Sequence, residues 1–223
     1  MDAQSILERA ERIRFPDKGF QVDIAIASET PGRDPDVRKY RVLSKDNDNT
    51  LVMTTAPAID RGQILLMKES DLWLFMPDVS QPIRLPLSQR LTGQVANGDL
   101  ARAKFIGDYD AKFLHTETID GEDYFLLELQ AARRRVTYRR ILYWVHSKTF
   151  HPFKAEFYSV SKRLLKTCYY RNYQIVLGEP RPTELLIIDA LRKGFESVLV
   201  YNDMKFRKLP SKVFTKQYLK KLQ

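Results

Sequence analysis

The sequence predicts a mainly β protein of the α+β class, built on one large, strongly curved antiparallel sheet or an incomplete barrel of about eleven strands. From Gly19 onward, apolar and polar residues alternate with a period of two in one segment after another. Turn signals separate these segments at short intervals, which indicates antiparallel neighbours. Helical spacing occurs only near the two ends of the chain and once in its middle. A sheet with so many strands must curve strongly or begin to close.

Composition indicates one folded domain over residues 1–223. The chain is 43% hydrophobic and 29% charged, without a repeat or a linker rich in Gly, Ser or Pro. Its formal net charge of +9 favours an anionic partner, either nucleic acid, a phospholipid surface or an acidic protein. The single Cys168 cannot form an intramolecular disulfide, and no apolar run is long enough for a membrane helix.

The first predicted element is an amphipathic helix within residues 1–16. Ala3, Ile6, Leu7, Ala10 and Ile13 recur at helical spacing, and the charged residues 8, 9, 11 and 12 lie opposite them. Pro16 ends the helix.

Strands follow in order, beginning with GFQVDIAIAS (19–28), in which Val22, Ile24 and Ile26 share one face. Turns are predicted at 44–50, 60–62, 68–71 and 77–82. The pair Asp120-Gly121 is typical of a type I′ hairpin between KFLHTETI and EDYFLLELQ. Later strands are VTYRRILYWVHS, HPFKAEFYS, RLLKTCYYRNY, TELLIIDA and ESVLVYNDMKF.

Two further helical segments are expected. Residues 97–113 form the only interruption of the strands, where Asp99 can cap a short helix that carries Leu100 and Ala103 and ends at Gly107. A short basic helix is expected in PSKVFTKQYLKKL, with Phe214, Tyr218 and Leu222 at fourfold spacing.

The stretch 131–173 is both basic and aromatic, and it allows two interpretations. In HPFKAEFYS, Phe153, Ala155 and Phe157 alternate with Lys154, Glu156 and Tyr158, so the aromatic and charged side chains fall on opposite faces. A nucleic-acid platform needs both kinds on one surface. The pattern therefore favours the wall of an apolar container over a nucleic-acid binder, with an ordinary sandwich core and a solvated basic exterior as a third interpretation.

Catalytic and metal-binding signals are scarce, and we expect no enzyme, no metal and no cofactor. GxSxG, HExxH and GxGxxG motifs are absent from the sequence. Gly93 and Gly98 have the spacing of a phosphate loop, but Asp99 and Leu100 follow where Lys and Ser or Thr are needed. Asp108 and Asp110 could be paired carboxylates, but at a helix end we expect contact with the helix dipole or solvent.

Four segments carry a resemblance to a known family: LPLSQRLTGQ, GDLARAKFIGDYDAKF, TYRRILYWVHSKTFHPFKAEFYS and LLKTCYYRNY. Together they resemble the outer-membrane lipoprotein-sorting proteins, the LolA/LolB-like carriers, in an uncharacterised branch. The resemblance implies an unclosed antiparallel β-barrel whose concave side is covered by α-helices, a periplasmic location with a leader already removed, and transport of acyl chains between membranes without catalysis.

These arguments lead to a predicted hydrophobic cavity for lipid or lipoprotein acyl chains. It is lined by fourteen predicted residues: Ile6, Leu7, Ala10, Val22, Ile24, Ile26, Trp73, Phe75, Leu100, Phe125, Leu127, Trp144, Phe153 and Phe157. Residues 1–16 and 97–113 cover it as lids. There are two alternatives. The first is an envelope sensor or adaptor that uses this same fold to bind a protein partner, and the second is a nucleic-acid binder that uses residues 131–173.

The C-terminal segment 205–223 is predicted to dock on anionic lipid or an acidic partner. It contains basic residues and no acids, and the docking residues are Lys208, Lys212, Lys216, Lys220 and Lys221. Relatives in the family suggest an inner-membrane exporter of the resistance-nodulation type, or an outer-membrane acceptor, as partners of a monomeric carrier. No nucleic-acid partner is expected.

Overall fold

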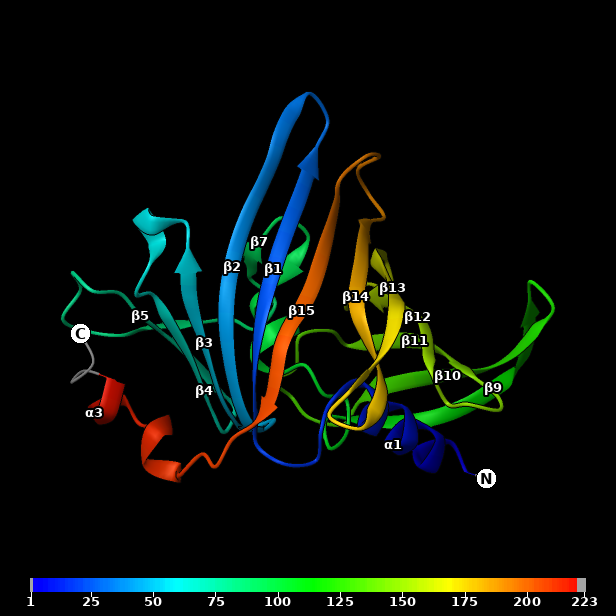
Figure 1. Ribbon diagram of the computed structural model, residues 1–223. Coiled ribbons are helices and arrows are strands. Elements are labelled where there is room, and N and C mark those ends of the chain that lie inside the picture. Colours follow the sequence, from blue (N-terminus) through cyan, green and yellow to red (C-terminus); the bar gives the residue numbers. More distant parts are fainter. Residues whose placement is uncertain (1, 220–223) are drawn as a thin grey trace.

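A computed structural model describes residues 2–219, and its core is one open antiparallel sheet of thirteen strands. Figure 1 shows this sheet bent into a deep trough, with β1, β2 and β15 at its centre and β9 and β10 sweeping away at one end. The strands lie in the order β6-β5-β4-β3-β2-β1-β15-β14-β13-β12-β11-β10-β9, so β6 and β9 are free edges. The predicted class, an unclosed antiparallel sheet with few helices, is confirmed.

The strands of this sheet are β1 (Phe20–Thr30), β2 (Arg33–Asp46), β3 (Asn49–Ala56), β4 (Ile64–Lys68), β5 (Asp71–Phe75), β6 (Ile83–Leu85), β9 (Tyr109–Ile119), β10 (Glu122–Ala131), β11 (Arg140–His146), β12 (Pro152–Tyr158), β13 (Leu164–Val176), β14 (Glu179–Asp189) and β15 (Glu196–Phe206). The short strands β7 (Arg90–Thr92) and β8 (Val95–Ala96) form a separate hairpin. The helical elements are α1 (Ala3–Arg14), α2 (Asn97–Ala101), α3 (Lys216–Leu219) and the 3₁₀ turns η1 (Ala58–Asp60) and η2 (Ser211–Phe214). The sheet has thirteen strands where the sequence predicts about eleven. Elements such as the three-residue β6 are too short to show an alternation of apolar and polar residues in the sequence.

Nearly every pair of neighbours in the sheet is joined by a hairpin, as the turn signals predict. At Asp120-Gly121 both residues have positive φ, 51° and 84°, as a type I′ turn requires. The one pairing between strands far apart in sequence is β1 with β15, which joins the first and last strands at the centre of the sheet.

Helix α1 forms where the sequence predicts it and lies across the concave side. The Asp2 carboxylate accepts a hydrogen bond from the Ser5 N–H and caps the first turn. The helix ends before Pro16 and packs against β9, β12 and β14. At its far end, the Arg181 guanidinium of β14 donates to the carbonyls of Arg12 and Ile13.

The mid-chain segment is less helical than predicted. Helix α2 spans only Asn97–Ala101, residues 102–108 form turns, and β9 already begins at Tyr109. Asp99 does not act as an N-cap from outside the helix. It lies within α2, and its carboxylate accepts from the Ala96 N–H. The tyrosine and alternating residues after Gly107 favour a strand over a longer helix.

The C-terminal segment folds back on the convex side instead of forming one helix. η2 and α3 are separated at Thr215, and they pack Phe214 and Leu219 onto the outer face of β3 and β4. Residues 205 and 206 still belong to β15, so this segment starts later than predicted. Leu222, the third residue of the predicted helical spacing, lies outside the described residues.

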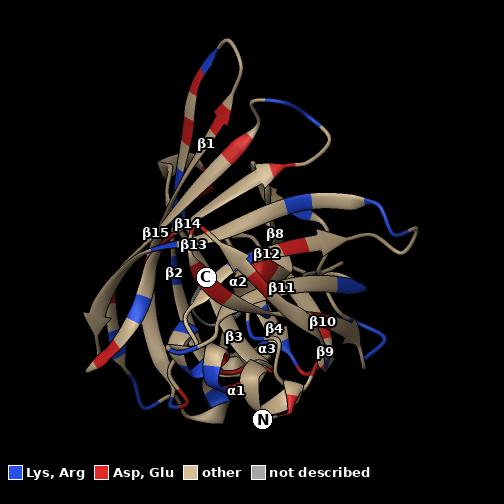
Figure 2. Cartoon of the chain, turned by 90° about the vertical axis from the view of Figure 1, so that its right-hand side faces the viewer, with Lys and Arg blue, Asp and Glu red and all other residues tan. Residues whose placement is uncertain are grey.

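The sheet therefore carries an apolar cluster on each face. The large cluster fills the concave side, and a smaller one lies on the convex side beneath η2 and α3. Figure 2 shows the charged residues as short bands along the strands and in the loops that join them. The concave cluster is the larger apolar environment that the fold provides for a ligand.

Candidate functional site

Along most central strands every second residue faces the concave side, and most of these residues are apolar. Strand β1 contributes Val22, Ile24 and Ile26, each at most 4% exposed. Strands β10 and β11 extend the surface with Leu127 and Tyr143, which are fully buried. The apolar concave face can hold an acyl chain only where the segments that cover it leave or create room.

Ten of the fourteen predicted cavity residues lie on this concave side. From α1 and α2 come Ile6, Leu7, Ala10 and Leu100, and from the sheet come Val22, Ile24, Ile26, Phe125, Leu127 and Phe157. Phe125 is only partly buried and packs at the edge of the cluster. The structure places these residues together in one cluster.

Trp73 and Phe75 lie on the opposite face, which corrects the prediction. Both belong to the convex cluster beneath the C-terminal segment, where Phe75 is 1% exposed and the Lys216 ammonium lies over the Trp73 ring. Leu72 and Leu74 of β5 point inward instead. Because DLWLF is apolar on both faces, its alternation could not show which side faces the lids.

Trp144 and Phe153 are also on the convex side. Trp144 lies under the Lys154 ammonium, 3.8 Å from the ring centre, and its Nε1–H donates to Glu117. Phe153 packs against Tyr124, with ring centres 4.7 Å apart. The register shift between β11 and β12 falls beside Phe153, so a bulge turns this ring outward while Ala155 and Phe157 stay inward.

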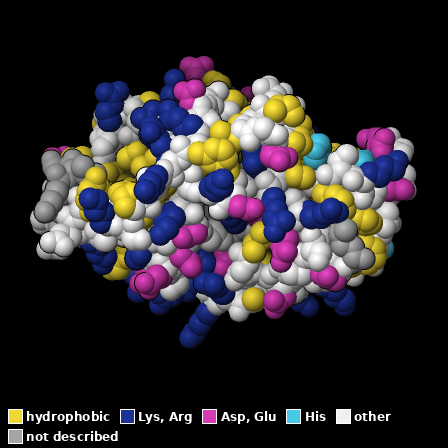
Figure 3. Space-filling model, turned by 60° about the horizontal axis from the view of Figure 1, so that its bottom comes forward, with side chains coloured by type: hydrophobic (Ala, Val, Ile, Leu, Met, Phe, Trp, Pro, Cys, Tyr) yellow, Lys and Arg dark blue, Asp and Glu magenta, His cyan; other side chains and the backbone are white. Residues whose placement is uncertain are grey.

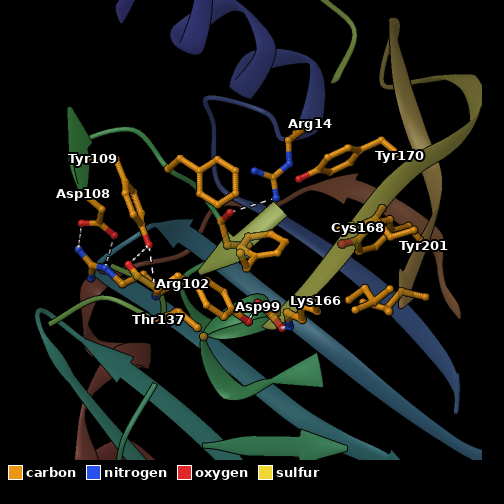
Figure 4. A pocket seen from close by; sticks show the side chains of 18 residues that line it. Arg14, Asp99, Arg102, Asp108, Tyr109, Thr137, Lys166, Cys168, Tyr170 and Tyr201 are labelled. Atoms are coloured by element: carbon orange, nitrogen blue, oxygen red, sulfur yellow. Dashed lines mark hydrogen bonds and ion pairs between the residues drawn. The ribbon is translucent and has the colours of Figure 1, made fainter. Parts of the chain in front are cut away.

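The lids lie close on the concave face and leave little free volume beneath them. One cavity of about 30 Å³ lies between the α2–β9 segment and β12–β15, and its wall includes Tyr138, Phe157 and Cys168. A second, of about 20 Å³, lies against Val22 and Ile24. Each cavity has room for roughly one or two water molecules. Figure 4 shows the first cavity, in which aromatic rings and charged side chains meet.

A buried ion pair holds α1 to the loop after α2. Glu11 and Arg14 are 1% and 7% exposed, and the Arg14 guanidinium donates to Glu11 Oε1 over 2.7 Å. Glu11 Oε2 accepts from the Phe105 N–H at 2.7 Å, and Arg14 donates to the Ala103 carbonyl. Burial alone would lower the pKa of Arg14, but the Glu11 carboxylate together with Tyr170 and Tyr143 raises that pKa well above its usual value. Sequence reasoning placed Glu11 on the solvent side of the helix, which is wrong.

Two further polar groups fix the same loop. Arg102 pairs with Asp108, at 2.5 and 2.6 Å, and also donates to Asp48 and to the Glu69 carbonyl. Asp108 is therefore a buried partner of an arginine, not a solvent-facing carboxylate. These contacts tie residues 102–108 to the β2–β3 and β4–β5 turns.

Asp99 is the polar centre of the first cavity. Its carboxylate accepts from the Lys166 ammonium at 2.5 Å and from the Tyr138 hydroxyl at 2.8 Å. Nearby, burial raises the pKa of the Cys168 thiol to about 12, so this thiol stays protonated at neutral pH. The polar side chains around Asp99 thus satisfy one another's hydrogen-bonding groups. The Asp99–Lys166 ion pair also connects α2 to β13.

More open space lies at the β6 edge of the sheet. A pocket of about 150 Å³ lies on the inner side of β2–β5, walled by Val52, Leu65 and Leu74. Next to it, and sharing Leu85 with it, is a groove of about 450 Å³ that reaches the surface. Of these four spaces, the groove is the one whose volume falls in the range typical of ligand sites.

The basic stretch 131–173 does not form a free cationic platform. The ion pairs along it are Arg133 with Asp48 and Asp108, Arg135 with Asp71, Arg140 with Glu128, Lys154 with Glu156, Lys166 with Asp99, and Arg171 with Glu184. On the face drawn in Figure 3, basic side chains are interspersed with acidic and apolar ones. On the convex side Lys154 lies over Trp144 and Arg140 over Tyr158, so basic and aromatic side chains do share a surface there. Each of these two cations is paired with a carboxylate that competes with a phosphate, which disfavours the nucleic-acid interpretation.

Of the predicted docking residues, Lys208, Lys212 and Lys216 are exposed. Lys220 and Lys221 lie outside the described residues. Within residues 2–219, no three His, Cys, Asp or Glu side chains come together as metal ligands. In the same range, no helix has the length and apolar character needed to cross a membrane.

Comparisons with known proteins identify relatives over nearly the whole chain. A family model described as an uncharacterized protein matches residues 46–221. A crystal structure of a LolA superfamily protein from Nitrosomonas europaea is 59% identical, covers 98% of this chain and 99% of its own, and has a TM-score of 0.94. Curated protein sequences contain no match.

Two more distant structures show the same fold. A putative outer membrane lipoprotein-sorting protein domain from Vibrio parahaemolyticus is 21% identical, with a TM-score of 0.82 and 98% of both chains covered. A DUF1329 family protein from Desulfovibrio piger is 19% identical, with a TM-score of 0.81 and 97% of both chains covered.

Proposed function

The chain belongs to the LolA superfamily, and on that premise we propose that it is a non-catalytic carrier that binds acyl chains of lipids or lipoproteins in the periplasm. The observation that carries the proposal is the apolar concave face, covered by α1 and the α2–β9 segment. Each methylene moved from water to such a surface gains about 0.8 kcal/mol, without any fixed polar contact.

The small cavities beneath the lids correspond to a closed arrangement of the lids. Only about 30 and 20 Å³ are free there, so an acyl chain has to displace the lids or enter from the β6 edge. The pocket beside Leu65 and Leu74, of about 150 Å³, offers a place where the end of a chain can start. Opening α1 away from the sheet would then extend the space toward Phe157.

Partners follow from this function. A carrier takes cargo from one membrane and gives it to another, and we propose an inner-membrane exporter or an outer-membrane acceptor as the exchange partner. The exposed cations Lys208 and Lys212 are suited to brief contact with anionic headgroups during this exchange.

The adaptor alternative has one observation in its favour. Edge strand β9 leaves Phe113 and Leu114 exposed, at 44% and 37%, and a free edge can pair with a strand of another protein. An adaptor would bind its partner without taking up lipid, so lipid uptake separates the two functions.

Binding of a fluorescent monoacylglycerol, which has no charged headgroup, tests the proposal. We expect saturable binding to the parent protein. Leu74→Trp fills the inner pocket and should weaken this binding at least tenfold. Met53→Trp places the same ring on the convex side and serves as the matched control, with unchanged binding. No saturable binding to the parent, or equal loss in both variants, would refute an acyl site on the concave face.

A further inference from the structure

The groove at the β6 edge contains two arginines that share a single acidic partner. Arg84 of β6 and Arg135 of the β10–β11 loop both donate to the same oxygen, Oδ1 of Asp71. Their side chains are 48% and 52% exposed, so both guanidinium groups border open space. Among the described residues, these contacts with Asp71 are the hydrogen bonds of the two guanidinium groups, so most of their N–H donors remain available.

Charge in the groove is therefore positive. Two guanidinium groups and one carboxylate give a net charge of about +1, since a guanidinium stays protonated in proteins. The hydroxyls of Ser70 and Ser88 also line the groove and can donate to an anion. Arginine forks match the oxygens of a phosphate group and bind them through paired N–H bonds.

The wall of the groove is apolar and continues into the concave cluster. Leu72 and Leu87, which line it, are 1% and 7% exposed and belong to that cluster. Leu85 faces both the groove and the inner pocket. A ligand with a phosphate between the arginines would thus have a continuous apolar path toward the interior.

The loop that carries Arg135 brings this site together from distant strands. Residues 132–139 follow β10, near one edge of the sheet, whereas Asp71 and Arg84 belong to β5 and β6 at the other edge. The Arg135–Asp71 ion pair therefore spans the gap of the unclosed sheet. A headgroup bound there would lie at the opening between the two ends of the sheet, not against the middle of its concave face.

We propose that this groove binds the phosphate headgroup of an anionic phospholipid whose acyl chains enter the concave face. The inference rests on the proposed function, because it names the cargo class of the same container. Asp71 holds the two arginines in place and would compete with the phosphate for them. This competition gives the inference a signature that a purely structural ion pair would not produce.

The test compares short-chain phosphatidylglycerol, below its micelle concentration, with the neutral monoacylglycerol on the full chain. Arg84→Gln and Arg135→Gln should each weaken phosphatidylglycerol binding about tenfold and leave monoacylglycerol binding unchanged. Asp71→Asn should strengthen phosphatidylglycerol binding severalfold, because it removes the competing carboxylate. Arg163→Gln, an exposed arginine outside the groove, removes the same charge and should change neither.

The outcomes separate the two proposals. If monoacylglycerol does not bind the parent, the carrier function fails. If it binds but the arginine variants affect both lipids equally, or Asp71→Asn weakens phosphatidylglycerol binding, the headgroup inference alone is overturned. The binding of inorganic phosphate to the parent protein is measured as well. If inorganic phosphate binds as tightly as the phospholipid, the groove is a site for the free ion, which would contradict a lipid site.

Discussion

At the residue scale, the interior combines an apolar surface with a few buried charges, and the two have different roles. The rings and aliphatic side chains of the concave face provide a surface without directional demands. Glu11 and Arg14, in contrast, make specific contacts with the backbone of residues 103 and 105. A buried ion pair contributes little net stability but strongly favours one arrangement of its elements. We therefore regard this pair as the contact that defines the closed lid.

Removing one partner of this pair should be costly. Glu11→Gln leaves the Arg14 charge buried without a carboxylate and should lower the free energy of unfolding by about 3–5 kcal/mol. The double variant Glu11→Leu with Arg14→Met should lose less, because no charge remains uncompensated. Urea unfolding of each protein measures these differences.

Glu8→Gln is the matched control, since Glu8 lies on the same helix and is only half-buried. Its free energy of unfolding should stay within about 0.5 kcal/mol of the parent value. A Glu11→Gln protein as stable as the Glu8→Gln protein would show that the pair does not hold the lid.

At the element scale, alternation predicts the strands well but not the side that each residue faces. Val22, Ile24 and Ile26 alternate with polar neighbours, so their inward direction follows from the sequence. Strand β5 is apolar on both faces because the C-terminal segment covers its outer side. The sequence DLWLF does not indicate that a distant segment packs there. Phe153 turns outward through a bulge, which adds one residue and breaks the period of two.

Short helical elements were equally hard to predict. Phe214 and Tyr218 have helical spacing, but the chain divides them between η2 and α3 to fit the convex cluster. The loop after α2 owes its form to Arg102, whose partners Asp48 and Asp108 come from different parts of the chain. Such contacts depend on tertiary structure and leave no local pattern.

The C-terminal segment should have two separable roles. Phe214→Ala opens the convex cluster and should lower the free energy of unfolding by about 3–5 kcal/mol, as measured by urea unfolding.

Lys208→Glu with Lys212→Glu changes exposed residues only, so it should leave the free energy of unfolding unchanged and weaken binding to vesicles that contain anionic lipid. Binding that falls equally in vesicles of neutral lipid, or is unchanged with anionic vesicles at low salt, would contradict the docking role.

At the scale of the whole molecule, a single open sheet creates an inside and an outside that serve different purposes. The length of the chain and its turn signals make this architecture predictable from the sequence. The free volume of the interior cannot be predicted in the same way. That volume depends on how closely α1 and residues 102–108 lie on the sheet, and here they leave only small cavities. The groove at Arg84 and Arg135 likewise arises only when the two edges of the sheet face each other.

The central claim is that acyl chains lie on the concave side of this sheet. Photo-crosslinking with a monoacylglycerol that carries a diazirine near the end of its chain, followed by peptide mass spectrometry, tests this location most directly. We predict labels on inward residues such as Val52, Leu65 and Leu74, and strongly reduced labelling when unlabelled lipid competes. Labels on outward residues such as Leu66 and Trp73, or labelling that unlabelled lipid does not reduce, would contradict the account.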